Sequence, residues 1–320
     1  MSKGPLVSVV IPCFNASRTI VATLESLEAQ TWPEIEVIAV DDGSSDATHS
    51  ILTARTVKAR AITVLAQPNR GQTVALNAGM RLATGDWFQF LDADDLLHPE
   101  KIRLQVNALR DRPHSLAASR WARFYGEAPG TVALEGADRD DWMPASDWLK
   151  REWHDGGGML FPARWLVSRS LAQSIGPWNE SLTVNNDGEF FTRALKRADG
   201  VTDTAGAIAF YRSGNPGSLS GRRTPEGLAS YFRSLQLITE ELDDLLRGDQ
   251  RLRDCLGCMW MRFAYGSYPY VPDLVERAEA TSKSLTSKGL PFDGGQTIRV
   301  VSRLFGWRAA RRLQRLAGRA

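Results

Sequence analysis

Three carboxylates lie within four residues of one another, directly after an apolar stretch. Asp92, Asp94 and Asp95 follow Trp87–Leu91, a run that is typical of a buried strand. Like charges this close repel each other unless a cation lies between them. Carboxylate oxygens at a strand end suit Mg²⁺ or Mn²⁺, which in turn bind phosphates. The pattern indicates a divalent-metal site; the alternative is a solvated acidic turn before the helix that starts near Pro99.

A second acidic cluster, Asp41–Asp46, follows another apolar run, Ile35–Val40. Two further strands are expected at Val7–Pro12 and Ala61–Leu65, with helices between the strands. Alternation of this kind predicts an α/β protein with a parallel sheet and right-handed crossovers. Ligands bind beyond the carboxyl ends of the strands in such sheets. Asp42 and the Asp92–Asp95 cluster are therefore expected to share one site.

The rest of the chain is expected to continue this fold and then become helical. The pattern predicts a helix at Thr73–Ala83, a helix at Lys101–Asp111, a strand at Leu116–Tyr125, a loop at 126–147 and a short strand at Met159–Phe161. An amphipathic helix is expected to follow Asn186, and the chain to be helical from about 225 onward. No internal repeat is apparent.

Length and composition indicate a globular protein with a substantial core, in a reducing compartment. The chain has 320 residues, of which 43% are hydrophobic, enough for a substantial core. Three cysteines do not make a disulfide framework, so a cytoplasmic location is expected. Leu6–Phe14 is too short and too soon interrupted by Pro12 for a secretory signal, and no run approaches the length of a membrane span.

Positive charge is concentrated near the C-terminus. The net charge is +2, yet seven arginines and no acids follow Asp293, while residues 1–293 carry 32 basic and 37 acidic groups. On a helical wheel of residues 308–319, arginines occupy one side and Ala or Leu the other. Such a helix is typical of an element that contacts an anionic membrane, here the inner face of the plasma membrane. The alternative is a helix packed on the body with a solvated arginine face.

Several motifs, in a characteristic order, give this chain a family resemblance. They are V-S-V-V-I-P-x-F-N-A from Val7, V-D-D-G-S-S-D-A-T from Val40, N-x-G-Q-T-x-A-L-N-x-G from Asn69, A-T-G-D-W-x-x-F-L-D-A-D-D from Ala83 and I-G-P-W-N-E-S-L from Ile175. Together they resemble a family 2 inverting glycosyltransferase of the GT-A fold, over roughly residues 5–220. The resemblance implies a Rossmann-like, mostly parallel sheet flanked by helices at 1–222, with a helical C-terminal region at 223–320.

The resemblance also implies the ligands. It implies a nucleotide-sugar donor, most often a UDP-sugar, a glycan or lipid-linked acceptor in cell-surface polysaccharide or glycoconjugate synthesis, and Mn²⁺ or Mg²⁺ held by Asp94 with Asp92. No nucleic-acid partner is expected. The implied nucleotide-binding residues are Pro12, Phe14, Asn15, Asp42, Asn69, Gly71, Asp92 and Arg212. Asp42 has a turn or helix-cap role as its alternative, and Arg212 an ordinary place on a surface loop.

Inversion requires a general base on the acceptor side. The resemblance places it at Asp187, but this chain has N-D-G-E where relatives more often have an E-D pair, so Glu189 is a rival. Both could instead be favourable charges in the first turn of a helix. The segment 211–220 lacks the histidine that many relatives have, and Leu76 replaces a common arginine.

Two other functions compete with this interpretation. A nucleotidyltransferase would also use a parallel α/β sheet and metal-binding carboxylates, but it usually has a glycine-rich loop after the first strand, and Pro12–Arg18 contains no glycine. A catalytically inert sugar-nucleotide-binding module is disfavoured by the presence of Asp92, Asp94 and Asp187.

Overall fold

The computed structural model describes residues 4–58, 60–214, 223–288 and 296–316. The chain forms two compact units. The first comprises Met1–Trp148 and Leu160–Leu219, and the second comprises Leu149–Met159 and Ser220–Ala320. The short stretch Leu149–Met159, which the predicted boundary at 222/223 places in the first domain, thus groups with the C-terminal helices.

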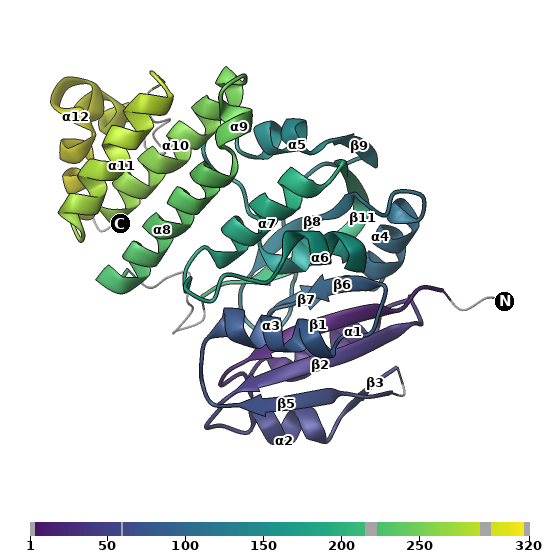
Figure 1. The fold of residues 1–320 in the computed structure, drawn as a ribbon. Helices are drawn as coiled ribbons and strands as arrows, with labels where there is room; N and C mark the ends of the chain where they lie inside the picture. Colours follow the sequence, from purple (N-terminus) through teal and green to yellow (C-terminus); the bar gives the residue numbers. More distant parts are fainter. Residues whose placement is uncertain (1–3, 59, 215–222, 289–295, 317–320) are drawn as a thin grey trace. The chain divides into compact units, whose positions relative to one another are not determined.

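Four parallel strands form one half of the central sheet, in the order β5-β2-β1-β6 (Figure 1). Their bounds are β1 (Val7–Cys13), β2 (Ile35–Asp42), β5 (Thr63–Gln67) and β6 (Trp87–Phe90). Every residue of β1 is buried, because strands cover both of its edges and helices its faces. These parallel strands confirm the sequence prediction, and their carboxyl ends meet at one edge of the sheet.

The other half of the sheet is mixed, in the order β10-β8-β11-β7, with β9 also paired to β11. The bounds are β7 (Leu96–Leu97), β8 (Leu116–Phe124), β9 (Asp141–Pro144), β10 (Trp165–Ser168) and β11 (Gly200–Arg212). β10 runs antiparallel to both neighbours, whereas β11 is parallel to β8. Strands β3 (Thr56–Val57) and β4 (Arg60–Ala61) form a separate hairpin. The predicted strand at Met159–Phe161 is wrong, and the predicted loop at 126–147 contains β9.

Helices flank this sheet. They are α1 (Ile20–Glu28), α2 (Thr48–Thr53), α3 (Gln72–Leu82), α4 (Lys101–Leu109), α5 (Ala145–Glu152), the 3₁₀ helix η1 (Pro162–Arg164), α6 (Arg169–Ile175) and α7 (Asn186–Arg197). Helix α3 packs closely on β1 and β2. A Cβ on Gly79 would lie 2.4 Å from Cγ1 of Val10, so only glycine permits this approach.

The second unit is helical, as predicted. Its helices are α8 (Pro225–Glu241), α9 (Asp243–Leu246), α10 (Gln250–Ser267), α11 (Pro272–Leu285) and α12 (Gln296–Leu316). Phe232 and Trp260 pack edge to face in its core, with ring centroids 5.0 Å apart. Cys255 and Cys258 are buried free thiols. None of the described helices is long and apolar enough to cross a membrane.

Candidate active site

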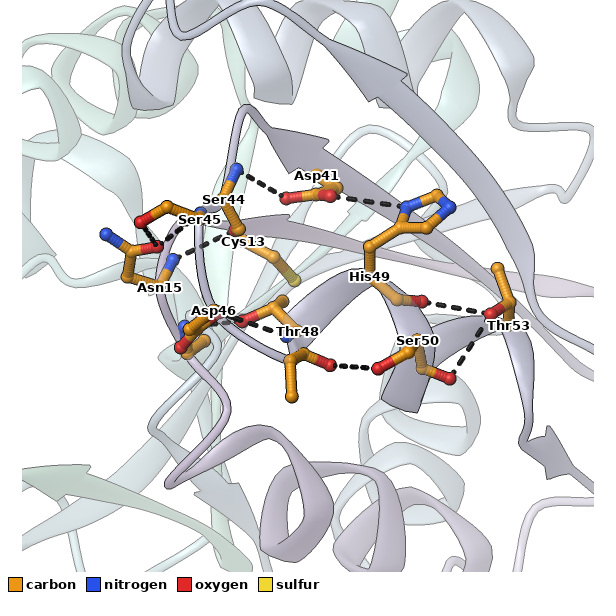
Figure 2. Close-up of polar contacts among 12 residues, drawn as sticks. Cys13, Asn15, Asp41, Ser44, Ser45, Asp46, Thr48, His49, Ser50 and Thr53 are labelled. Carbon is orange, nitrogen blue, oxygen red and sulfur yellow. Dashed lines mark hydrogen bonds and ion pairs between the residues drawn. The ribbon is translucent and has the colours of Figure 1, made fainter.

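Hydrogen bonds tie together the turns that follow β1 and β2 (Figure 2). The backbone N–H of Asn15 donates to Oγ of Ser44 at 2.9 Å, and Oδ1 of Asn15 accepts from the backbone N–H of Ser45 at 2.8 Å. Asn15 has a φ of 48°, a left-handed conformation that asparagine adopts more readily than most residues. Asn15, a predicted nucleotide ligand, thus holds the two turns together through these hydrogen bonds.

Two further aspartates stabilise this region. Asp41 is buried and accepts from the backbone N–H of Ser44 at 3.1 Å, while Nδ1 of His49 lies 3.2 Å from its other oxygen (Figure 2). Asp46 accepts from the backbone N–H groups of Ser17 and Thr48. Burial opposes ionisation of Asp46, but these hydrogen bonds outweigh it and lower its pKa to about 2.

Asp42 is buried at the end of β2 and holds the loop between β5 and α3. Its Oδ1 accepts from the amide of Gln67 at 2.7 Å and from the backbone N–H of Arg70 at 2.9 Å. Its Oδ2 accepts from the backbone N–H of Gly71 at 2.8 Å. A carboxylate accepts about four hydrogen bonds, so Asp42 keeps capacity for about one more. That is enough for the single base N–H that the predicted nucleotide role requires.

The other predicted nucleotide-binding residues surround this edge of the sheet. Phe14 follows β1 and is 51% exposed, as a ring available for stacking would be, whereas Pro12 is buried within β1. Asn69 lies against the turn after β2. The approach is so close that a Cβ on Gly43 would lie 2.7 Å from the backbone nitrogen of Asn69. Gly43 also has a φ of 73°, which glycine adopts without strain.

The segment Asp92–Asp95, here called the aspartate loop, is anchored from two sides. The hydroxyl of Thr23 on α1 lies 3.1 Å from the carbonyl oxygen of Ala93 and 3.0 Å from that of Asp95. Nε of Arg212 donates to the carbonyl oxygen of Asp94 at 2.8 Å. The Arg212 guanidinium also donates to the carbonyls of Gly126 and Glu127 and lies over the ring of Phe124. Arg212 thus braces the aspartate loop.

Asp95 is the most deeply buried carboxylate of the loop. Its Oδ1 accepts from the backbone N–H of Arg212 at 2.9 Å, while its Oδ2 has no partner among the described residues. Burial, together with the negative charges of Asp94 and Asp92, raises its pKa well above the ordinary value. Asp95 therefore ionises less readily than an ordinary aspartate, and its hydrogen bond to the Arg212 backbone makes it a structural member of the loop.

A glutamine on α3 joins the aspartate loop to α7. The amide nitrogen of Gln72 donates to Oδ1 of Asp92 at 2.7 Å, and its amide oxygen accepts from Nδ2 of Asn186 at 3.2 Å. Asn186 directly precedes Asp187 in the first turn of α7. Gln72 thereby links Asp92 to the residue that directly precedes Asp187.

Negative charge accumulates where these elements meet. Burial raises the pKa of Asp92 to about 7, and the charges of Asp94 and Asp187 contribute to this shift. Burial also raises the pKa of Asp187, against hydrogen bonds from backbone N–H groups such as that of Gly188. Two carboxylates almost a hundred residues apart in sequence, Asp92 and Asp187, thus act on one another electrostatically.

Glu189, the rival base, is engaged elsewhere. Its two oxygens accept from Nε and Nη2 of Arg193 at 2.7 and 3.0 Å, and both side chains are largely buried. Arg193 also donates to the carbonyl oxygens of Ile175 and Pro177. The bidentate guanidinium fixes Glu189 in place and occupies both of its oxygens, so this geometry favours Asp187 as the proton acceptor.

The motif around Trp178 positions α7 against the sheet. The Trp178 ring stacks on Phe190 with centroids 4.0 Å apart and planes inclined by 3°. Asn77 on α3 accepts from the backbone N–H of Trp178 at 2.8 Å and donates to its carbonyl oxygen at 2.9 Å. This connection fixes the start of α7, and with it Asp187, relative to α3.

The described residues offer only some of the ligands that a divalent cation needs. In the part of the chain that the structure describes, no group of three or more His, Cys, Asp or Glu is arranged to hold a metal ion. Asp92 and Asp94 nonetheless offer hard oxygen ligands. Burial is the main cause of the raised pKa of Asp92, and a cation would offset the smaller contribution from the negative charges of Asp94 and Asp187. Donor phosphates would supply the remaining ligands.

Sequence reasoning missed several residues that organise the site. These are Thr23, Gln72, Asn77, Asn186 and Arg193. Only Arg193 carried a usable signal, since Glu and Arg four residues apart on a helix commonly pair. Gln72 and Asn77 are letters of the motif that begins at Asn69, but the motif does not reveal their partners. Their contacts, and those of Thr23 and Asn186, join segments distant in sequence.

Comparisons with known proteins agree with this geometry. The family model described as "Glycosyl transferase family 2" matches residues 8–176. The chain is 37% identical over 231 residues to the succinoglycan biosynthesis protein ExoO of Rhizobium meliloti, covering 67% of this chain and 63% of that protein. It is 39% identical over 106 residues to an uncharacterized glycosyltransferase of Rickettsia typhi, covering 33% of this chain and 32% of that protein. In both cases the match spans less than two thirds of the relative's length.

The fold is similar to a solved glycosyltransferase structure. The crystal structure of S. aureus TarS 1-349 in complex with UDP-GlcNAc superposes with a TM-score of 0.68 at 17% sequence identity, covering 98% of this chain and 92% of that one. At this level of identity the similarity concerns the fold, which is that of the GT-A glycosyltransferases.

Proposed function

This chain belongs to glycosyltransferase family 2, and we propose that it moves a sugar, with inversion, from a UDP-sugar to a hydroxyl group of a glycan or lipid-linked acceptor. The observation that carries the proposal is the electrostatic convergence of Asp92, Asp94 and Asp187 beyond the carboxyl end of β6. Their position matches the place where ligands bind in open α/β sheets.

The donor side of the site rests on the first two strands. Phe14 offers an exposed ring for a base, and Asp42 keeps about one acceptor position for a base N–H. The nucleotide in the structure of the similar TarS protein, together with this acceptor chemistry, supports uracil as the base. Pro12, Asn15, Asn69 and Gly71 shape the surrounding backbone.

The leaving diphosphate needs compensating positive charge. Asp94 and Asp92 would hold Mn²⁺ or Mg²⁺, which when bound supplies Lewis-acid stabilisation of the leaving group. Arg212 is a buried cation that contacts the aspartate loop, but its guanidinium donates to backbone carbonyls. We therefore assign Arg212 to bracing the aspartate loop.

Asp187 is the proposed general base, which accepts the proton of the attacking hydroxyl group. Its raised pKa suits that task, because proton transfer is most efficient when the pKa of the base lies closer to the working pH. Glu189 forms a buried ion pair with Arg193 and is assigned a structural role.

The biological setting follows the same reasoning. Relatives such as ExoO, a succinoglycan biosynthesis protein, support a role in polysaccharide or glycoconjugate synthesis. Three buried free thiols suit a reducing compartment such as the cytoplasm. The membrane contact predicted through 308–319 falls partly outside the described residues, and the described arginines 308–315 pack on aromatic rings of the same unit.

The proposal is tested by incubating the protein with Mn²⁺ and UDP-, GDP- and dTDP-sugars and measuring release of the nucleoside diphosphate. We expect release from a UDP-sugar, its loss in Asp187→Asn, and its retention in Glu189→Gln preparations that remain folded. Release of pyrophosphate from a nucleoside triphosphate and a sugar phosphate would instead identify a nucleotidyltransferase. Nucleotide binding without release of a nucleoside diphosphate, whichever cell extract is added as a source of acceptor, would identify an inert module.

A further inference from the structure

Helix α12 is divided by Gly306, whose φ of 81° and ψ of 162° are not helical. The part after the kink is packed: Nε of Arg312 donates to the hydroxyl of Tyr268 at 2.8 Å, and Arg311 and Arg315 lie over the rings of Tyr265 and Tyr270. Three arginines of the face expected to meet solvent or membrane thus contact tyrosines, although Arg312 remains exposed. This leaves the part before the kink, Gln296–Phe305, here called the amphipathic segment.

The amphipathic segment exposes its apolar side chains. Val300, Leu304 and Phe305 are 55%, 67% and 72% exposed. Val300 and Leu304 are four residues apart and share one side of the helix, while Arg299 and Arg303 are likewise four apart and lie on another side. The result is a helix about 15 Å long with a bulky apolar face and a cationic face.

Such a segment requires a covering surface. Helices shorter than about 12 residues are marginal in water on their own, and most helical stability comes from packing of the apolar face. Within the described part of the chain, little of the apolar face of this segment is buried. Bulky apolar residues beside arginines are also the composition of helices that lie in a membrane interface.

The charge of the amphipathic segment indicates which kind of surface covers it. Residues 296–316 contain six arginines and no aspartate or glutamate. A second copy of the same face would bring arginine against arginine, which is repulsive, whereas an anionic lipid surface complements it. We propose that the amphipathic segment docks on an anionic bilayer, with Leu304 and Phe305 among the acyl chains and Arg299 and Arg303 at the headgroups.

The test is co-sedimentation of the full chain with vesicles of phosphatidylcholine alone and of phosphatidylcholine mixed with phosphatidylglycerol. We expect binding to the anionic vesicles only. Leu304→Ser/Phe305→Ser and Arg299→Gln/Arg303→Gln should each weaken it on the order of tenfold. The matched control is Leu82→Ser/Arg81→Gln, which removes an exposed leucine and a neighbouring exposed arginine from α3 and should leave binding unchanged.

Circular dichroism and the urea unfolding midpoint show that each variant is folded, and light scattering without lipid gives the oligomeric state. Equal binding to neutral vesicles, or unweakened binding by either amphipathic-segment variant, would overturn the proposal. So would a wild-type dimer that binds no vesicles and becomes monomeric in Leu304→Ser/Phe305→Ser, because the face would then be an interface between copies. The assay needs no sugar donor, so it succeeds or fails independently of the proposed enzymatic function.

Discussion

The side-chain amide nitrogen of Gln72 lies 2.7 Å from Oδ1 of Asp92 and donates a hydrogen bond to it. Gln72 is the first residue of α3, and Asp92 follows β6, so this contact fixes the aspartate loop relative to a helix terminus. Through its amide oxygen, Gln72 also meets Asn186, beside the proposed base. One uncharged side chain thus couples the proposed metal and acceptor sides of the site.

Replacing Gln72 by alanine should weaken the metal side of the site without unfolding the protein. The hydrogen bond lowers the pKa of Asp92, so its loss favours the protonated carboxyl, which binds metal poorly. We expect the Mn²⁺ concentration for half-maximal activity to rise by about tenfold or more. The matched control is Gln173→Ala, an exposed glutamine on α6. Equal Mn²⁺ dependence in the two variants would refute the coupling role.

Replacing one or the other of the two candidate bases should have different effects on activity and stability. Asp187→Asn should lower the turnover number by about 10²- to 10⁴-fold, because the general base is lost, and leave UDP affinity nearly unchanged. Glu189→Gln should instead lower the free energy of unfolding by about 3 kcal/mol, because Arg193 loses its buried partner. Turnover, calorimetric UDP affinity and urea denaturation measure these effects. A stable but inactive Glu189→Gln beside an active Asp187→Asn would reverse the assignment.

Gly71 should tolerate no side chain. Its φ of 95° and ψ of 160° belong to a region that is nearly restricted to glycine, and its N–H bonds Asp42. Gly71→Ala should lower the free energy of unfolding by about 1–3 kcal/mol and weaken UDP binding. Gly157→Ala is the control, since a Cβ there also meets open space but the backbone is not left-handed. Equal stability of both variants would show that the loop is not held as described.

Without metal, ionisation of Asp92 should make the free energy of unfolding decrease as pH rises. Its folded-state pKa of about 7 exceeds the ordinary 3.8, so between these values the native state binds more protons than the unfolded state. Its stabilising contribution is complete below the lower value and is lost as pH rises through 7. In EDTA, the unfolding free energy of wild type relative to Asp92→Asn should therefore decrease from about pH 5 to about pH 8. A difference that is constant or increases would contradict the shift.

The parallel half of the sheet could be predicted because its strands are continuous apolar runs between polar turns. In the mixed half the predicted strand Leu116–Tyr125 is confirmed by β8, but β10 and β11 were not predicted. Gly200–Arg212 contains Thr, Asp and Gly among its apolar residues and lacks strict alternation. The position of Asp187 followed from family resemblance. Its advantage over Glu189 emerged only from the contacts of Arg193.

Arginine side chains were the hardest to place from sequence. Arg212 was expected either at a phosphate or on a surface loop, yet it is buried among backbone carbonyls. The helical wheel placed the arginines of residues 308–319 on one side and Ala and Leu on the other, but the structure buries Ala310 and Arg311 together and leaves Leu316 exposed. It could not show which side is covered, because that depends on Tyr265 in α10 and Tyr268 directly after α10.

The most direct test of the central claim is calorimetric titration of UDP into wild type and Asp94→Asn, with Mn²⁺ and with EDTA, followed by single-turnover transfer. The account predicts tight binding by wild type only with Mn²⁺, loss of that dependence and of turnover in Asp94→Asn, and full folding of both proteins. UDP affinity that is identical in all four titrations, with turnover intact in Asp94→Asn, would contradict it.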